Sequence, residues 1–104
     1  MPGVDFNLLR SEIQIQQVLD LLGFQPSTRS TSQLRGPCPI HRSSSKHSRS
    51  FSVSLTKQRF YCHRCRAHGN VLELWAAVHE QDIYRAALEL CTALGRDVPW
   101  VRRW

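Results

Sequence analysis

Two short segments of the 104-residue chain decide its fold: CPIH at residues 38–41 and CHRC at residues 62–65. Each carries two potential metal ligands separated by two residues, a spacing that lets both side chains reach one ion from a tight turn. Zinc prefers four tetrahedral ligands of sulfur and nitrogen, and a closed site leaves no position for a substrate or an activated water. The segments therefore predict one structural Zn²⁺, with the ligands Cys38, His41, Cys62 and Cys65.

The alternative interpretation is that these side chains fall near one another by chance, with Cys38 and Cys62 as ordinary core thiols. The composition of residues 27–50 counts against it, because this stretch holds only Leu34, Cys38 and Ile40 from the apolar set. So few apolar side chains cannot offset the conformational entropy of ordering the segment. Structural zinc supplies on the order of 10 kcal/mol of folding free energy, which is the right scale to hold it.

The residues between the two segments alternate as strands do. Residues 51–55 read FSVSL, residues 56–58 can turn, and residues 59–62 lead back into the second ligand pair. Residues 33–36 predict a further short strand that leads into the first pair. A hairpin that ends in metal knuckles is a zinc ribbon, so a zinc ribbon is the expected centre of the fold.

Outside the ribbon, apolar residues recur at three- and four-residue intervals, which is typical of amphipathic helices. Residues 8–22 predict one helix, with Asp5 or Asn7 as its N-cap and Gly23 at its end. The expected fold is α+β: a small zinc ribbon, an antiparallel β-hairpin with zinc knuckles, flanked by an N-terminal helix and two C-terminal helices. We expect one domain over 1–104, with the N-terminal helix in 1–24, the ribbon in 33–68, the C-terminal helices in 70–95 and a Trp/Arg tail in 96–104.

Strand alternation assigns the hairpin side chains to opposite faces. Phe51 is expected to face the core, and Phe60 shares its parity with the ligand Cys62. Tyr61 is then the better candidate for exposure, although core packing is the alternative for each aromatic side chain. His63 and His68 are expected not to bind the metal. Cys91 is also expected not to bind it and to be a buried core thiol.

The charge of the chain is concentrated in one block. The formal net charge is +6, and residues 21–72 contain nine Lys and Arg but no Asp or Glu. Such a block favours a polyanionic partner, most often nucleic acid, over a merely solvated basic surface. Basic side chains would meet phosphates and an exposed tyrosine would stack on an unpaired base. The candidate contacts are Arg42, Arg49, Lys57, Arg59, Tyr61, Arg64 and Arg66.

Three segments resemble those of the CHC2 zinc-binding domain at the N-terminus of bacterial and phage DNA primases: GPCPIH at 36–41, SFSVS at 50–54 and FYCHRCRAHGNV at 60–71. With the flanking helices, the resemblance covers about residues 13–95. It implies the same four zinc ligands, and it implies binding of single-stranded template DNA and help in selecting where an RNA primer starts. The chain departs from the family pattern in a longer, serine-rich loop after His41 and in two basic knuckle residues, Arg64 and Arg66.

The acidic residues give no sign of catalysis. Template-directed polymerisation needs a carboxylate cluster that holds Mg²⁺, and the only close acidic pair, Glu80 and Asp82, stands at a helix start, where capping explains it. We therefore expect a zinc-dependent nucleic-acid-binding module and not an enzyme. It would be a detached primase-type zinc subunit that engages single-stranded DNA in replication or in a mobile element. The alternative is a protein–protein adaptor in which the zinc ribbon is only a structural scaffold.

Two of the three tryptophans, Trp100 and Trp104, lie in the tail. Such a tail either folds back over the helices or serves as a docking peptide, because Trp and Arg dominate interface energetics. The expected partner is a separate polymerase, helicase or recombinase, bound through the helices or the tail. The sequence holds no run of about 20 apolar residues and no secretory signal, so we expect no membrane contact and a cytoplasmic location in a bacterium or for a phage.

Overall fold

The computed structural model describes residues 3–40 and 50–101. The helices of this part are α1 (Phe6–Glu12), α2 (Ile15–Leu22), α3 (Val71–His79) and α4 (Ile83–Leu94). A five-stranded antiparallel sheet has the order β2 (Thr28–Arg29), β3 (Gln33–Gly36), β4 (Phe51–Ser54), β5 (Arg59–Cys62) and β6 (His68–Gly69). A separate antiparallel pair joins β1 (Gly3–Val4) to β7 (Trp100–Val101).

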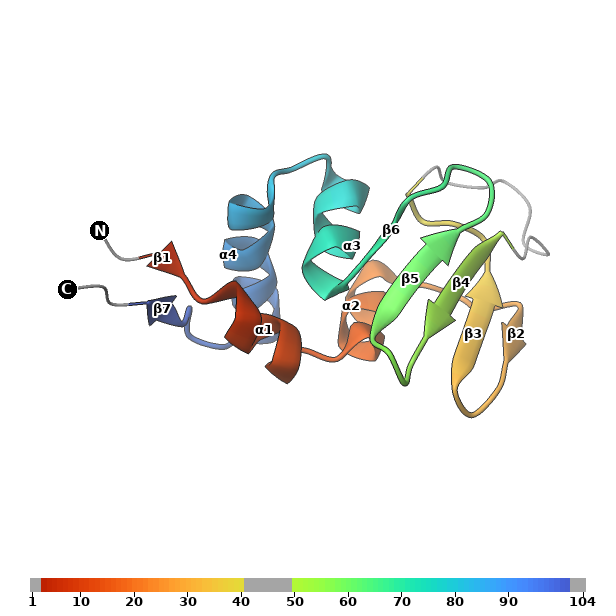
Figure 1. Ribbon diagram of the computed structural model, residues 1–104, viewed down its shortest axis with the longest axis horizontal. Coiled ribbons are helices and arrows are strands. Elements are labelled where there is room, and N and C mark those ends of the chain that lie inside the picture. The colour runs from red at the N-terminus through yellow and green to blue at the C-terminus, as the bar shows by residue number, and fades with distance from the viewer. Residues whose placement is uncertain (1–2, 41–49, 102–104) are drawn as a thin grey trace.

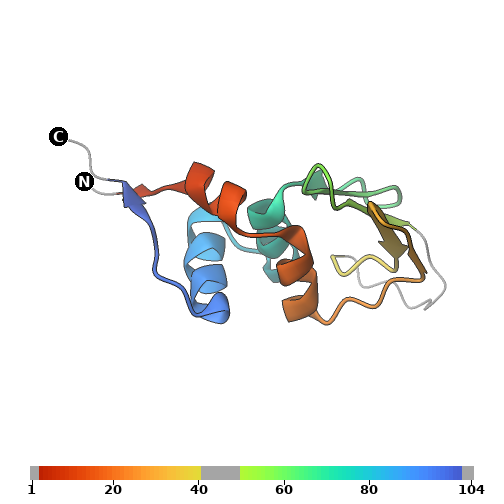
Figure 2. The same ribbon diagram turned by 90° about the horizontal axis from the view of Figure 1, so that it is seen from below.

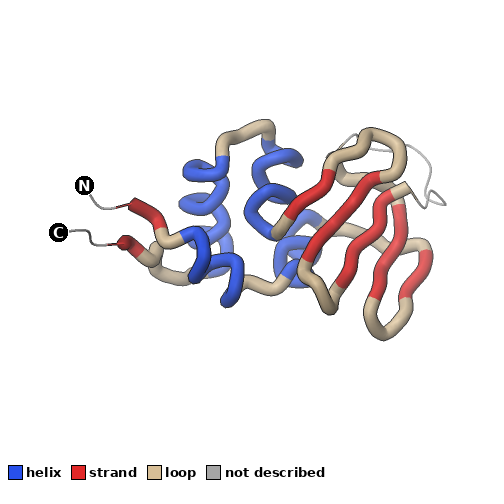
Figure 3. Tube along the Cα trace, in the orientation of Figure 1, coloured by secondary structure: helices blue, strands red, loops and turns tan. Residues whose placement is uncertain are grey.

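The molecule is elongated, with extents of 50 × 27 × 22 Å. The five-stranded sheet forms one end and the β1–β7 pair forms the other, with the helices between them (Figures 1 and 3). Seen from the second direction, α2 and α3 lie next to the sheet, and α3 separates it from α4 (Figure 2). The expected α+β class is thus confirmed, with the ribbon at one end of the molecule rather than at its centre.

The predicted hairpin is present as β4 and β5, and the turn between them spans residues 55–58, one residue more than predicted. The expected strand at residues 33–36 is also present, and it pairs with β4. The ribbon nevertheless extends beyond the hairpin, because β2 joins β3 and β6 joins β5. These two added strands have two residues each, which is too short for an alternating pattern to appear in the sequence.

The prediction of one N-terminal helix over residues 8–22 is wrong. The chain forms α1 and α2, and Ile13 between them is extended at φ −89° and ψ 124°. Ile13 and Ile15 are both buried, at 1% and 0% exposure, and residues two apart in one helix face nearly opposite directions. The break therefore lets both side chains enter the core. The backbone N–H of Ile15 donates to Oε1 of Gln58, 2.6 Å away in the β4–β5 turn, and this bond satisfies a free donor at the start of α2.

Alternate side chains of the sheet supply one side of the core. Phe51 is fully buried, and its ring packs edge-on to Phe24 at 5.4 Å and stacks on Phe60 at 5.7 Å between ring centroids. Cys91 is also buried, on α4, as expected. Tyr61 is 40% exposed, so strand parity assigned the aromatic residues correctly. The sheet consequently has an apolar inner face and a polar outer face.

Gly69 links the ribbon to α3 at a place where no side chain fits. Its φ is +147°, and an added Cβ would lie 2.7 Å from Cβ of Glu73. Glu73 accepts the Asn70 backbone N–H at 3.1 Å while the Asn70 side chain caps α3, so it cannot move without loss of the cap. We expect Gly69→Ala to lower the free energy of unfolding by about 2 kcal/mol in urea denaturation. Gly3→Ala, where nothing lies within 4 Å of the added Cβ, is the matched control and should change it little.

The tail does not lay Trp100 over the helices. Trp100 is paired in β7 and stays 48% exposed, while the backbone N–H of Asp5 donates to the carbonyl of Pro99 at 2.7 Å. The first and last described segments are therefore held to each other. Trp104 lies outside the described residues. Among the helices of the described part, none combines the length and the apolar character needed to cross a bilayer.

Candidate metal centre and sheet surface

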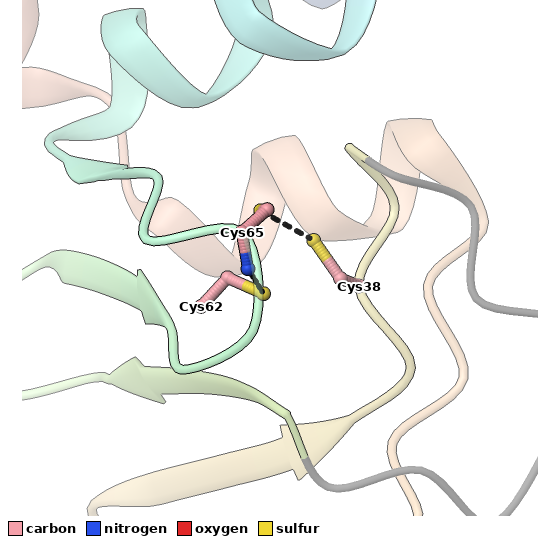
Figure 4. Close-up of side chains that lie close together, drawn as sticks. All are labelled: Cys38, Cys62 and Cys65. Atoms are coloured by element: carbon pink, nitrogen blue, oxygen red, sulfur yellow. Dashed lines mark hydrogen bonds between the residues drawn. The ribbon is translucent and has the colours of Figure 1, made fainter.

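Three cysteine sulfurs lie close together at one end of the strands of the five-stranded sheet. Cys38 follows β3, Cys62 ends β5, and Cys65 lies in the turn that leads to β6. Their Sγ atoms all lie within 4.8 Å of one another, and those of Cys38 and Cys65 are 3.9 Å apart (Figure 4). Sulfur ligands at about 2.3 Å from a tetrahedral zinc ion are about 3.8 Å from each other. The three thiols are therefore placed to take three corners of a zinc site, after an approach of at most about 1 Å between sulfurs.

Backbone hydrogen bonds shape the turn that carries two of these thiols. The N–H of Cys65 donates to Sγ of Cys62 at 3.4 Å, and the N–H of Arg66 donates to the Cys62 carbonyl at 2.8 Å. Arg66 has φ +63°, a left-handed conformation that glycine adopts more readily than other residues. The arginine side chain is therefore carried by a mildly strained backbone position.

The Cys62 thiol is tuned toward the form that binds metal. Burial raises the pKa of this thiol. Hydrogen bonds from the backbone N–H groups of Cys65 and Arg64, and contacts with the thiols of Cys65 and Cys38, lower it. The net pKa lies below the ordinary value of a cysteine. Zinc binds the thiolate and not the thiol. The turn is thus arranged for a metal ligand rather than for a core thiol. Cys91 contrasts with it, since burial raises the pKa of that thiol.

The fourth expected ligand, His41, lies outside the described residues and remains a prediction. His63 and His68 are exposed and are not part of the thiol cluster found among the described residues. Their rings instead lie against Tyr61, with centroids 4.8 Å and 6.1 Å from its ring. Within the described part of the chain, the donors that converge on a metal position are therefore the three cysteines.

Strand register aligns a row of polar side chains across the outer face of the sheet. Arg35 of β3 pairs with Ser52 of β4, Ser52 pairs with Tyr61 of β5, and Tyr61 pairs with His68 of β6. We call these four residues the sheet row. A hollow of about 310 Å³ lies on this face and is lined by Ser52, Ser54, Arg59, Phe60, Tyr61 and His68. The hollow combines hydroxyl groups, a cation and an exposed aromatic ring.

The structure brings only some of the predicted contact residues together. Arg59 and Tyr61 border the hollow, whereas Lys57 is exposed in the β4–β5 turn at one end of β5. Arg64 and Arg66 are exposed at the other end of β5, in the turn that carries Cys65. Sequence reasoning missed Arg35, Ser52 and His68 as members of this surface, although strand parity could have placed the first two on the outer face. Two predicted residues, Arg42 and Arg49, lie outside the described residues.

Comparisons with known proteins place these features in a family context. The model of the CHC2 zinc finger family matches residues 3–103. The DNA primase of Rickettsia typhi is 32% identical over 95 residues, which cover 90% of this chain and 15% of that protein. The DNA primase of Pseudomonas putida is 39% identical over 62 residues, which cover 60% of this chain and 9% of that protein. The chain thus spans about 15% of the length of the relatives it matches most fully.

A solved structure supports the same comparison. The chain is similar to the crystal structure of the Aquifex aeolicus primase, described as its zinc binding and RNA polymerase domains, with a TM-score of 0.73. The sequences are 29% identical, and the match covers 92% of this chain and 23% of that one. The similarity therefore extends over nearly the whole fold described above, and over a small part of the relative.

Proposed function

The chain belongs to the CHC2 zinc finger family, with Zn²⁺ as its cofactor, and from this premise we propose that it is a primase-type module that engages single-stranded DNA. The zinc ion holds the ribbon together, with His41 as the fourth ligand beside the three cysteines. Its role is structural: bound zinc crosslinks β3 to the turn after β5 and so fixes the sheet whose outer face meets the nucleic acid.

The sheet row is the observation that carries this proposal. Neighbouring strands lie about 4.8 Å apart, so a row over four strands presents groups along a path that a nucleic acid backbone can follow. Tyr61 offers an exposed ring on which an unpaired base can stack, an interaction worth about 1–3 kcal/mol per base. The hydroxyl groups of Ser52 and Ser54 border the same hollow and can bond to base edges.

Charge supports the same surface. Residues 21–72 contain no Asp or Glu, so no carboxylate of the ribbon repels phosphate. Lys57 and Arg59 stand at one end of β5, and Arg64 and Arg66 at the other, on either side of Tyr61 along the chain. We therefore assign phosphate contacts to both ends of β5 and base contacts to its middle. Arg42 and Arg49 would add to this charge from the segment before β4.

The module would act together with other replication proteins. The part of the primases that it matches is the zinc-binding part, about 15% of their length. We propose that it acts as a detached zinc subunit in DNA replication or in a mobile element, beside a separate polymerase, helicase or recombinase. The exposed Trp100 of β7, at the opposite end of the molecule from the sheet, and Trp104 are candidate contacts for such a protein. A pure adaptor, with the ribbon as scaffold only, is the competing function.

Salt dependence separates these two functions. For single strands, the logarithm of the binding constant falls against the logarithm of salt concentration with a slope of about −0.7 per neutralised phosphate. Replacing Lys57 and Arg59 together by glutamine is expected to make the slope shallower by about 1.4 and to leave the zinc content unchanged. The measurement is fluorescence anisotropy of a labelled single-stranded oligonucleotide over a salt series.

The matched control removes two cations from the helices, as Arg10→Gln with Arg85→Gln. This variant has the same change of net charge but should keep the slope of the parent. An oligonucleotide that does not bind at low salt, or equal slopes for the two double variants, would favour the adaptor.

A further inference from the structure

The helical half of the molecule has a groove that lies away from the zinc ligands and the sheet row. It has a volume of about 600 Å³ and lies against α4 and the adjoining part of α3. The residues of interest in its lining are Trp75, Asp82, Tyr84, Arg85, Leu88 and Glu89. We call it the α4 groove. It is unrelated to the sheet, because α3 lies between the sheet and α4 in both views (Figures 1 and 2).

One large side chain, that of Tyr84, is exposed in the α4 groove although α4 already packs its other side into the core. Ala86, Ala87 and Leu90 of that side are fully buried. Tyr84, in contrast, is 49% exposed. Large aromatic side chains are the groups that most often anchor protein interfaces. The groove thus has an apolar part that the fold itself does not cover.

A carboxylate is held in place beside this apolar part. Nε2 of Gln81 donates to Oε2 of Glu89 at 2.8 Å, and Nε1 of Trp75 donates to Oε1 at 3.4 Å. These hydrogen bonds, the first of them above all, and the charge of Arg85 lower the pKa of Glu89 despite its partial burial, so the group stays ionised. Asp82 adds a second carboxylate at the start of α4, where it accepts the N–H of Arg85 at 2.8 Å.

The surroundings extend this negative charge. Residues 71–95 contain four Asp and Glu and one Arg, whereas the ribbon contains no acidic residue. Arg85 also lines the groove and lies 3.8 Å from Glu89, so its lining keeps one net negative charge, which favours a cationic group over nucleic acid. A groove beside two packed helices, apolar and acidic at once, is complementary to a third helix with apolar and basic side chains.

We propose that the α4 groove docks an amphipathic helix of a partner protein, with a large apolar side chain set against Tyr84 and a lysine or arginine set against Glu89. Because the groove and the sheet row occupy separate parts of the molecule, the same chain can hold this helix and single-stranded DNA together. The proposal rests on the groove alone and stands whether or not the sheet binds DNA.

The test uses the zinc-loaded full chain and a labelled 14-residue helical peptide of leucine and lysine as the probe. We expect the peptide to shift the amide NMR signals of Tyr84, Leu88 and Glu89. We also expect Tyr84→Ala and Glu89→Gln each to weaken binding about tenfold, as is typical of an aromatic anchor and of a close charge pair. The same peptide with glutamate in place of lysine should not bind.

Asp20→Asn is the matched control, because it removes one exposed carboxylate from α2 instead of the groove. It should change affinity less than twofold, and zinc content and helical circular dichroism should match among the variants. Equal weakening by Asp20→Asn, or signal shifts outside α3 and α4, would overturn the proposal. So would a concentration-dependent dimer that Tyr84→Ala abolishes, since the groove would then belong to a second copy of this chain.

Discussion

Replacing Cys62 by serine is expected to abolish stoichiometric zinc binding and to unfold the five-stranded sheet. The parent should contain one zinc ion per chain. Cys62 is fully buried, and its sulfur accepts the backbone N–H of Cys65 in the turn after β5. Metal-binding free energy at a structural site contributes directly to folding free energy, so the variant loses on the order of 10 kcal/mol of stability. The measurements are zinc per chain by elemental analysis and the far-ultraviolet circular dichroism of the variant.

Strong chelation of the parent should give the same result, with loss of strand signal and retention of some helix. Cys91→Ala is the matched control, because Cys91 is an equally buried cysteine that lies outside the thiol cluster. It should keep one zinc ion and lose only a small part of the stability. A Cys62→Ser protein as stable as its parent would show that the ribbon does not depend on the metal.

The second large effect is expected from Phe51→Ala. The Phe51 ring is fully buried between the rings of Phe24 and Phe60. Truncation of such a ring leaves a cavity and costs about 3–5 kcal/mol of unfolding free energy. Phe51 pairs with Cys62 across β4 and β5, but the variant keeps all the zinc ligands and should still bind one zinc ion at low temperature. Urea denaturation of the zinc-loaded protein measures the loss.

Leu21→Ala is the control for this change, since Leu21 is 41% exposed on α2 and its truncation should cost far less. Loss of zinc from Phe51→Ala under native conditions would contradict the expectation that zinc binding and core packing stabilise the fold separately. Comparable costs for the two variants would instead show that the inner face of the sheet is not the packed core described above.

Local patterns were sufficient to predict the ribbon. The convergence of Cys38, Cys62 and Cys65, the strand that begins at Phe51 and the Asp82 cap of the last helix follow from neighbouring residues, and the structure confirms these. His41 stays a prediction. Asp5 and Gly23 likewise begin and end the N-terminal helical region as expected, since Asp5 accepts the N–H of Leu8 at 3.1 Å and Gly23 has φ +70°.

Long-range contacts account for what the sequence did not reveal. The break before α2 brings both Ile13 and Ile15 into the core, and Gln58, 43 residues further along the chain than Ile15, accepts the Ile15 backbone N–H there. The β1–β7 pair joins segments from opposite ends of the described chain, with Gly3 opposite Val101. His68 enters the sheet row only because β6 pairs with β5. None of these partners can be identified from periodicity, which reports on neighbours within one element.

The proposed function requires that the outer face of the zinc-held sheet binds single-stranded DNA. The most direct measurement is a titration of the isotope-labelled, zinc-loaded chain with a short single-stranded oligonucleotide at low salt, followed through the amide NMR signals. We predict that the largest shifts fall on Ser52, Tyr61 and His68, while the signals of α4 stay in place. Shifts confined to the helices, or no shift at any signal, would contradict the claim.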